Sequence, residues 1–365
     1  MSSYTIQKIL NIFGTDVNRN TIIKAEVAGS IPISTRSETG AIRRRSWSIG
    51  DLPAIGERYG FMKKPEKPVT IAVFTTKGGV LKTTLSLNIA RMAALHNIRT
   101  CVVGLDLQGD VSAALGFNSG IEETDSLSDA IERMGTGGGL YGFNSKSMPL
   151  LDLALPTDIP TLFYIPENPE LVQLEQAISL RNNRDQWLKE HVIQPLHEHF
   201  DLVVLDCSPN WNRLVTNALV ACDVLVSPLE CKINNFRNFS VFRPFLEDFR
   251  RDLKLTFEQI FVPTRFTSTR KLSAEIRSWY LANVPECIHG VIRESVYGEE
   301  ATATRLSIPE YSPTSVAGDE MREVLLLIWN RTLEAIRNKE DQRSFSIDSP
   351  RPSKHGLPLE SPIHI

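Results

Sequence analysis

Runs of mainly apolar residues recur along the chain and alternate with segments whose apolar residues stand three or four positions apart. The runs cover residues 69–74, 99–105, 161–165, 202–205, 224–226 and 260–263. Helical spacing follows several of them, for example over 85–90, 111–115 and 214–221. Continuous apolar runs predict strands buried on both faces, and alternation with helices favours parallel pairing. We therefore expect an α/β fold with a doubly wound, mostly parallel sheet.

The first 64 residues show shorter helical patterns and are interpreted as a separate domain. Apolar residues at helical spacing over 6–13 predict a helix that Gly14 ends, and a second helix over 19–28 can be capped by Asp16 or Asn18. Residues 37–40 can turn a hairpin, and Ser48 can cap a third helix. This order predicts a small winged helix-turn-helix domain. Its wing would carry the basic residues Arg36, Arg43, Arg44 and Arg45.

Changes in composition mark the other boundaries. A charged, proline-bearing linker is expected over 65–68, followed by the main domain over 69–340. Within it, residues 116–150 are rich in Gly and Ser and are interpreted as a variable insertion, with a helical pattern over 127–134. Residues 341–365 are rich in Pro and Ser and predict a disordered tail.

The net charge of −3 and the apolar content of 42% are ordinary for a globular protein, so nucleic-acid binding would need a local basic patch. Residues 1–68 hold eleven Lys and Arg against six Asp and Glu. This local excess favours a duplex-binding domain, and a small protein-binding helical domain is the alternative. The five cysteines lie singly, which favours reduced thiols in a cytoplasmic protein. We expect no signal peptide and no membrane-spanning segment.

Residues 69–90 combine a predicted strand, a glycine-containing loop and a helix. Gly78 and Gly79 let the backbone approach an anion with its N–H groups, and the following helix adds the positive end of its dipole. Lys82 stands where an ammonium group would reach the β- and γ-phosphates of a nucleotide, and the Thr83 hydroxyl where it would ligate Mg²⁺. The segment predicts a phosphate-binding loop (P-loop), and a glycine-rich turn without a ligand is the alternative.

The loop departs from the usual P-loop pattern, because Thr76 and Leu81 replace its two glycines. It carries a second lysine, Lys77, and K-G-G-V-L-K-T-T resembles the K-G-G-V-G-K-T-T loop of the ParA/MinD family of deviant Walker ATPases. The resemblance implies ATP and Mg²⁺ as cofactors, and a front lysine that reaches the partner's ATP in a homodimer. The nucleotide-binding residues implied in this loop are Lys77, Gly78, Gly79, Val80, Lys82, Thr83 and Thr84.

Two aspartates that follow predicted strands extend the resemblance. Asp206 ends the run 202–205, which resembles the family's Walker B strand, and would hold Mg²⁺ together with Thr83. Asp106 ends the run 99–105 and takes the place of the second aspartate of the family's D-x-D segment, which orients the attacking water. Gly104 stands where the first aspartate is usual. The catalytic residues implied by the resemblance are Lys77, Lys82 and Asp106.

Two further resemblances concern DNA. Residues 25–52 resemble the winged helix-turn-helix of MerR-type proteins, which implies duplex binding by the N-terminal domain. Residues 260–301 resemble segments whose basic residues contact phosphates in family members that bind DNA without sequence preference. By position, Arg270, Lys271 and Arg293 are the candidates, and solvated surface residues are the alternative.

Taken together, the resemblances imply a cytoplasmic, nucleoid-associated partition ATPase. Such a protein would dimerise on ATP, bind DNA, hydrolyse ATP slowly and be stimulated by a ParB-like centromere-binding partner, while its N-terminal domain would repress its own operon. Two alternatives remain, a transcriptional regulator switched by ATP and a MinD-like membrane-associated positioning ATPase. The tail lacks a basic amphipathic pattern, which weighs against membrane binding.

Overall fold

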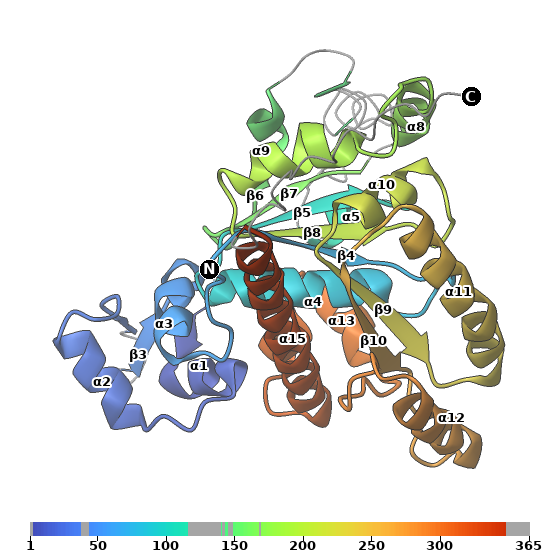
Figure 1. Ribbon diagram of the computed structural model, residues 1–365. Coiled ribbons are helices and arrows are strands. Elements are labelled where there is room, and N and C mark those ends of the chain that lie inside the picture. The colour runs from blue at the N-terminus through green and yellow to red at the C-terminus, as the bar shows by residue number, and fades with distance from the viewer. Residues whose placement is uncertain are drawn as a thin grey trace, which may run out of the picture.

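The computed structural model describes residues 3–37, 44–115, 140, 143–144, 149–167 and 169–347. Its centre is a seven-stranded sheet in the order β10-β9-β4-β8-β5-β7-β6, with helices on both faces (Figure 1). Neighbouring strands of this sheet pair in parallel except β6 with β7. The predicted α/β, doubly wound, mostly parallel fold is therefore confirmed. The strands are β4 (Val69–Val73), β5 (Thr100–Leu105), β6 (Leu155–Pro156), β7 (Leu162–Ile165), β8 (Leu202–Cys207), β9 (Val224–Glu230) and β10 (Glu258–Thr264).

The sheet separates two apolar cores, because successive side chains of a strand point to opposite faces. Ile71 and Val73 of β4 contribute to the first core, and Ala72 contributes to the second. The first core is covered by α4 (Lys82–Leu95), α5 (Asp110–Leu115), α13 (Tyr297–Ala303), α14 (Ile308–Tyr311) and α15 (Val316–Ile347). The second is covered by α8 (Leu171–Ser179), a π-helical stretch (Lys189–Ile193), α9 (Gln194–His197), α10 (Arg213–Ala221), α11 (Ile233–Asp252) and α12 (Lys271–Asn283).

The N-terminal part contains short helices and a three-stranded antiparallel sheet in the order β1-β3-β2. The first helix ends at Gly14 in the left-handed conformation, Asn18 caps the second, and Ser48 forms a capping box with Asp51 before the third. Its elements are β1 (Tyr4–Thr5), α1 (Ile6–Phe13), α2 (Arg19–Val27), β2 (Thr35–Ser37), β3 (Arg44–Trp47), η1 (Ile49–Asp51) and α3 (Leu52–Tyr59). The turn of the β2–β3 hairpin, with Arg43, lies outside the described residues.

This N-terminal part packs against the carboxyl end of α4 (Figure 1). Gly56 of α3 approaches so closely that a Cβ at this position would lie 2.0 Å from the Leu95 carbonyl oxygen. Next along the chain, buried His96 donates its Nδ1–H to the Met92 carbonyl at 2.6 Å, and its Nε2 accepts the Phe61 N–H at 3.0 Å. The second bond requires the neutral imidazole, because a protonated ring has no nitrogen left to accept. The contact between the two parts of the chain therefore includes a hydrogen bond that only an uncharged histidine can make.

We expect acid to weaken this contact, with a loss of about 3 kcal/mol in the free energy of unfolding between pH 6.5 and pH 4. Burial lowers the pKa of His96 from 6.5 to about 4. In that window the unfolded chain binds a proton that the folded chain excludes, so the contribution of His96 is complete above pH 6.5 and is lost as the pH falls. Urea unfolding at pH 7 and pH 4.5 measures it. The wild type should lose more stability than His96→Gln, with His199→Gln, an exposed histidine, behaving as wild type. Equal losses in wild type and His96→Gln would contradict the prediction.

Several elements differ in extent from the expectation. Helix α15 begins at Val316 and continues to Ile347, seven residues into the segment 341–365 that was predicted to be a disordered tail. Strand β6 is a short antiparallel edge that the apolar pattern did not reveal. The helical pattern over 127–134 and residues 348–365 lie outside the described residues. Among the described helices, none combines the length and apolarity needed to cross a membrane.

Candidate nucleotide-binding site

The predicted P-loop joins the end of β4 to the start of α4. The loop bends through left-handed backbone at Gly79 (φ +70°) and at Leu81 (φ +73°), and α4 begins directly afterwards at Lys82. The Lys82 side chain is buried and turns back into the loop, where its Nζ donates to the Lys77 carbonyl at 3.0 Å. Burial lowers the pKa of Lys82, and the nearby Asp206 and Asp106 oppose that shift. The loop thus presents backbone amides, a helix start and a buried ammonium group at one place, as an anion-binding loop requires.

Leu81 holds a backbone conformation that normally belongs to glycine. A left-handed non-glycine residue costs about 1–2 kcal/mol, because its Cβ crowds the following carbonyl. The Leu81 side chain packs against the first core, which offsets part of this cost, and it also lines the cavity described below. The departure from the usual glycine therefore adds a side chain to the wall of the site.

Asp206, the last carboxylate of β8, is buried at the foot of the P-loop helix. Thr83 donates its hydroxyl to Oδ2 at 2.8 Å, and Ser86, one turn further along α4, donates to Oδ1 at 2.6 Å. Burial raises the pKa of Asp206 to about 7, against the pull of these two hydroxyls. A buried carboxylate beside a threonine hydroxyl is an all-oxygen donor set of the kind that suits Mg²⁺. The residues present therefore fit a magnesium ion shared with phosphate oxygens.

A cavity of about 760 Å³ opens beside the start of α4. Its floor includes Leu81, Thr83 and Thr84, and its walls come from Arg265, from the segment 292–296 and from α13. Ile308 of α14 closes one end. Its volume lies within the range of small-molecule sites, and it meets the P-loop where the phosphates of a nucleotide would end. It is suited to the nucleoside part of a nucleotide.

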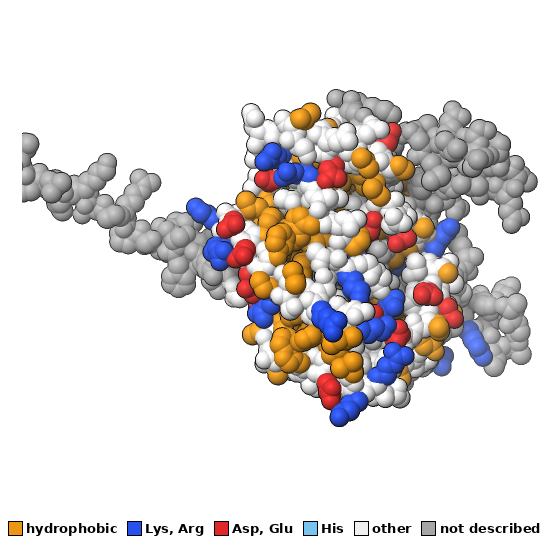
Figure 2. Space-filling view, turned by 90° about the vertical axis from the view of Figure 1, so that its right-hand side faces the viewer, with side chains coloured by type: hydrophobic (Ala, Val, Ile, Leu, Met, Phe, Trp, Pro, Cys, Tyr) orange, Lys and Arg blue, Asp and Glu red, His pale blue; other side chains and the backbone are white. Residues whose placement is uncertain are grey.

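The second lysine of the loop, Lys77, is held by a carboxylate of the neighbouring strand. Its Nζ lies 3.2 Å from Oε2 of Glu230, the last residue of β9. Glu230 is buried and also pairs with Lys232 at 3.1 Å, while Arg265 lies 4.0 Å away. Lys232 and Arg265 both reach Glu294 as well. Figure 2 looks onto this end of the sheet, and Lys and Arg side chains gather over the lower half of the view.

Comparison with known proteins places this geometry in a family. A family model described as an AAA domain matches residues 69–258, more than half of the chain. The chromosome partitioning protein ParA of Myxococcus xanthus is 28% identical over 224 residues, which cover 60% of this chain and 74% of that protein. A plasmid partition protein of Borrelia burgdorferi has a solved structure that covers 72% of this chain and 99% of its own, with a TM-score of 0.53 and 20% identity. The chain belongs to the ParA family.

A second solved structure has the same fold, but it belongs to a protein that is named for a different activity. Cobyrinic acid a,c-diamide synthase of Mycobacterium smegmatis, with bound ADP and magnesium, has a TM-score of 0.52 and 22% identity, and covers 71% of this chain and 92% of its own. At this identity the likeness establishes the fold alone. The function of this chain has to be argued from the residues of its own site.

The D-x-D segment implied by the resemblance is incomplete in this ParA-family chain, and the structure shows what lies beside the position without an aspartate. Asp106 follows β5 and remains partly exposed near Lys82. At position 104, however, the space that an aspartate side chain would occupy is filled by Glu167, which follows β7. Glu167 is buried and accepts hydrogen bonds from the first turn of α5.

The basic residues expected on the wing of this ParA-family chain fall into two kinds. Arg36 and Arg44 lie on β2 and β3 with exposed side chains. Arg45 instead forms an ion pair with Glu26 of α2 at 2.7 Å, and Glu26 also accepts the Ser34 N–H at 2.8 Å. Arg45 therefore ties the hairpin to α2, while the other two arginines are available to a ligand.

Two of the three candidates in the carboxyl-terminal half lie at the start of α12, away from the N-terminal part (Figure 1). Arg270 precedes α12 with an exposed side chain, and Lys271 is 92% exposed with a weak pair to Glu275 at 3.6 Å. Arg293 lines the cavity and pairs with Glu320 at 2.6 Å. The structure thus brings Arg270 and Lys271 together on the surface and places Arg293 at the nucleotide cavity.

Sequence reasoning missed four side chains of this site. Ser86 could have been found, because it follows Lys82 by one helical turn and so faces the same strand. Glu230 and Glu167 each follow an apolar run, the signal that had identified Asp106 and Asp206. No sequence pattern identified Arg265. Its place at the cavity depends on its own left-handed backbone conformation (φ +48°) in a loop.

Proposed function

We propose that this chain is an ATP-dependent DNA partition ATPase. ATP binding draws two subunits together, the dimer binds DNA without sequence preference, and hydrolysis releases it. The observation that carries this proposal is the pair of lysines, Lys77 and Lys82, on a P-loop that runs from β4 into α4 beside the buried Asp206. One P-loop lysine is enough to bind a nucleotide in a single subunit. In this proposal the second lysine, Lys77, therefore contacts the ATP of a second subunit.

The roles of the P-loop residues follow from their places. The amides of Gly78, Gly79 and Val80 and the Lys82 ammonium bind phosphate oxygens, and Thr84 borders the nucleoside cavity. Thr83 and Asp206 hold Mg²⁺, which when bound supplies the positive charge that offsets the phosphates. Asp106 orients the water that attacks the terminal phosphate.

Lys77 has to change partner in this proposal. In one subunit its ammonium group pairs with Glu230. On dimerisation it moves to the phosphates of the other subunit's ATP. Glu230 is not left alone when this happens, because Lys232 remains 3.1 Å away. The exchange therefore avoids the large cost of a buried carboxylate without a partner.

DNA would meet two surfaces. Arg270 and Lys271 serve the sequence-independent contact of the ATP-bound dimer, with Arg293 nearby at the cavity. The N-terminal domain, a winged helix-turn-helix in this proposal, would bind operator DNA through Arg36 and Arg44 and the neighbouring Arg43, and so repress its own operon. A ParB-like centromere-binding protein would accelerate slow intrinsic hydrolysis. These activities place the protein at the nucleoid in the cytoplasm.

The test is binding to random-sequence duplex DNA without nucleotide, with ADP and with ATP. We expect ATP alone to induce binding, and added salt to weaken it because phosphate contacts release counterions. Lys77→Ala should lose the ATP effect. Lys189→Ala is the matched control, since it removes an exposed lysine that belongs neither to the P-loop nor to the group around Glu230.

Two outcomes would contradict the proposal. Binding that is indifferent to nucleotide and to Lys77 would leave the N-terminal domain as the DNA-binding part and would favour an ATP-switched transcriptional regulator. Liposome binding that requires residues 341–365 would favour a membrane-associated positioning ATPase instead.

A further inference from the structure

At the carboxyl end of β5, position 104 has no side chain and a carboxylate from the neighbouring strand lies beside it. Gly104 has no side chain, and a Cβ built there would lie 2.1 Å from Oε2 and 2.7 Å from Cδ of Glu167. The two residues meet because β5 and β7 are parallel neighbours, with Val103 opposite Ile165. Glu167 therefore occupies the space beside β5 that a side chain at position 104 would need.

Glu167 is bound by donors from a single helix. Its Oε1 accepts the N–H groups of Val111 at 2.9 Å and Ser112 at 3.2 Å, and its Oε2 accepts the Ser112 hydroxyl at 2.9 Å. These amides belong to the first turn of α5, where backbone N–H groups have no partner within the helix. The side chain is only 7% exposed. Burying a carboxylate to this extent costs free energy, and the three hydrogen bonds from α5 offset that cost.

The anchored helix begins four residues after Asp106. The loop between them turns at Gly109 (φ +74°), whose N–H reaches the Asp106 carbonyl at 3.4 Å. Asp106 Oδ1 accepts the Gln108 N–H at 3.3 Å. Strand β5 fixes one end of this short loop, and the hydrogen bonds between Glu167 and α5 fix the other end. A shift of α5 would therefore be passed directly to the Asp106 carboxylate.

We propose that Glu167 is a positioning residue for ATP hydrolysis, which fixes Asp106 by anchoring the first turn of α5 and replaces, from the neighbouring strand, the side chain that position 104 lacks. The inference rests on the proposed function, because it needs ATP turnover in which Asp106 takes part. It predicts a larger effect on turnover than on nucleotide binding, because Glu167 itself does not line the cavity beside the P-loop, whereas Asp110 and Ala113 of the helix that it anchors do.

The experiment compares steady-state ATP turnover and nucleotide affinity in the full chain with DNA present. Glu167→Ala should lower kcat by about 10- to 100-fold, the scale of a misplaced catalytic group, and should change nucleotide affinity by a smaller factor. Glu167→Gln should keep most of kcat, because its amide oxygen still accepts from Val111 and Ser112. Glu198→Ala, at an exposed glutamate, is the control.

An exchange of the two side chains tests the spatial argument. Gly104→Asp alone should impair turnover, because its side chain collides with Glu167. Gly104→Asp combined with Glu167→Ala should turn over faster than either single variant, since a carboxylate is returned to the same space. If Glu167→Ala does not fold, the exchange variant is compared with Gly104→Asp alone, which should turn over more slowly than the exchange variant.

The outcomes separate this inference from the proposed function. Wild-type kcat in Glu167→Ala, or an exchange variant no better than the worse single variant, would overturn the positioning role while Asp106→Ala remains inactive. Wild-type turnover in Asp106→Ala, or no turnover in the wild type above the Lys82→Ala background, would overturn the proposed function and the inference together.

Discussion

Lys82→Ala is expected to weaken nucleotide binding by at least about 100-fold, or roughly 3 kcal/mol, because it removes a buried cation from a phosphate site. The Lys82 ammonium is already oriented into the P-loop, where it donates to the Lys77 carbonyl at 3.0 Å. A phosphate would replace that neutral acceptor with a charged one, so the hydrogen bond gains strength only when the nucleotide is present. Titration with a fluorescent ATP analogue measures the affinity of each variant.

Two companions make the result specific. Lys232→Ala removes a lysine that pairs with Glu230 at the same end of the sheet and should leave nucleotide affinity within about two-fold of wild type, because Lys232 lies outside the P-loop and Lys77 still pairs with Glu230. Asp106→Ala should bind nucleotide normally and lose turnover. Equal affinity in Lys82→Ala and the wild type, in proteins with the same melting temperature, would show that the loop is not a nucleotide site.

The elements of this site could be predicted because their signals are local. An apolar run followed by a carboxylate located Asp206 at the end of β8, and a strand, two glycines and a lysine located the loop before α4. A serine followed three positions later by an aspartate located the third helix of the N-terminal part. Each signal lies within a few residues, so neither the strand order nor the packing was needed to read it.

The contacts that complete the site depend on strand order, which local patterns do not contain. Glu167 fills the space beside Gly104 only because β7 lies next to β5, and Lys77 finds Glu230 only because β9 lies next to β4. Arg45 counted as a free wing residue until the fold brought Glu26 beside it. The sequence therefore located candidate charged residues, while their partners came from the three-dimensional arrangement.

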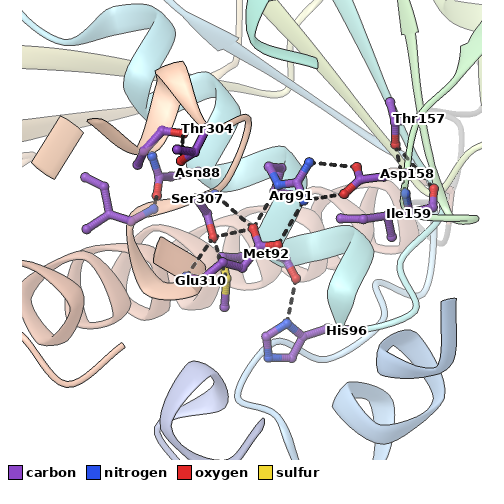
Figure 3. A network of polar contacts seen from close by, with 12 residues as sticks. Asn88, Arg91, Met92, His96, Thr157, Asp158, Ile159, Thr304, Ser307 and Glu310 are labelled. Atoms are coloured by element: carbon purple, nitrogen blue, oxygen red, sulfur yellow. Dashed lines mark hydrogen bonds and ion pairs between the residues drawn. The ribbon is translucent and has the colours of Figure 1, made fainter. Parts of the chain in front are cut away.

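A buried ion pair joins α4, the helix that follows the P-loop, to α14. No sequence pattern predicted this pair. Arg91 of α4 donates from Nε and Nη2 to Glu310 of α14 at 2.8 and 2.9 Å, and from Nη1 and Nη2 to Asp158 at 2.9 and 3.0 Å (Figure 3). The Arg91 and Glu310 side chains are 1% and 0% exposed, whereas Asp158 is 48% exposed. Glu310 also accepts the Ser307 hydroxyl at 2.6 Å.

Arg91→Met is expected to lower the free energy of unfolding by about 3–5 kcal/mol, because it leaves the Glu310 carboxylate buried without its cation. Asp158→Asn, the control, should cost less than about 1 kcal/mol, since its partner keeps Glu310 and the position is half-exposed. Urea unfolding at pH 7 measures both.

A second substitution separates the buried charge from lost packing. Adding Glu310→Gln to Arg91→Met should recover part of the loss, because the orphaned charge disappears and the Ser307 hydroxyl can still donate to the amide oxygen. If the double variant is no more stable than Arg91→Met, the pair acts through shape alone. Recovery would mean that the loss in Arg91→Met comes from an unpaired Glu310 carboxylate beside the nucleotide cavity, since α14 supplies both Glu310 and the cavity residue Ile308.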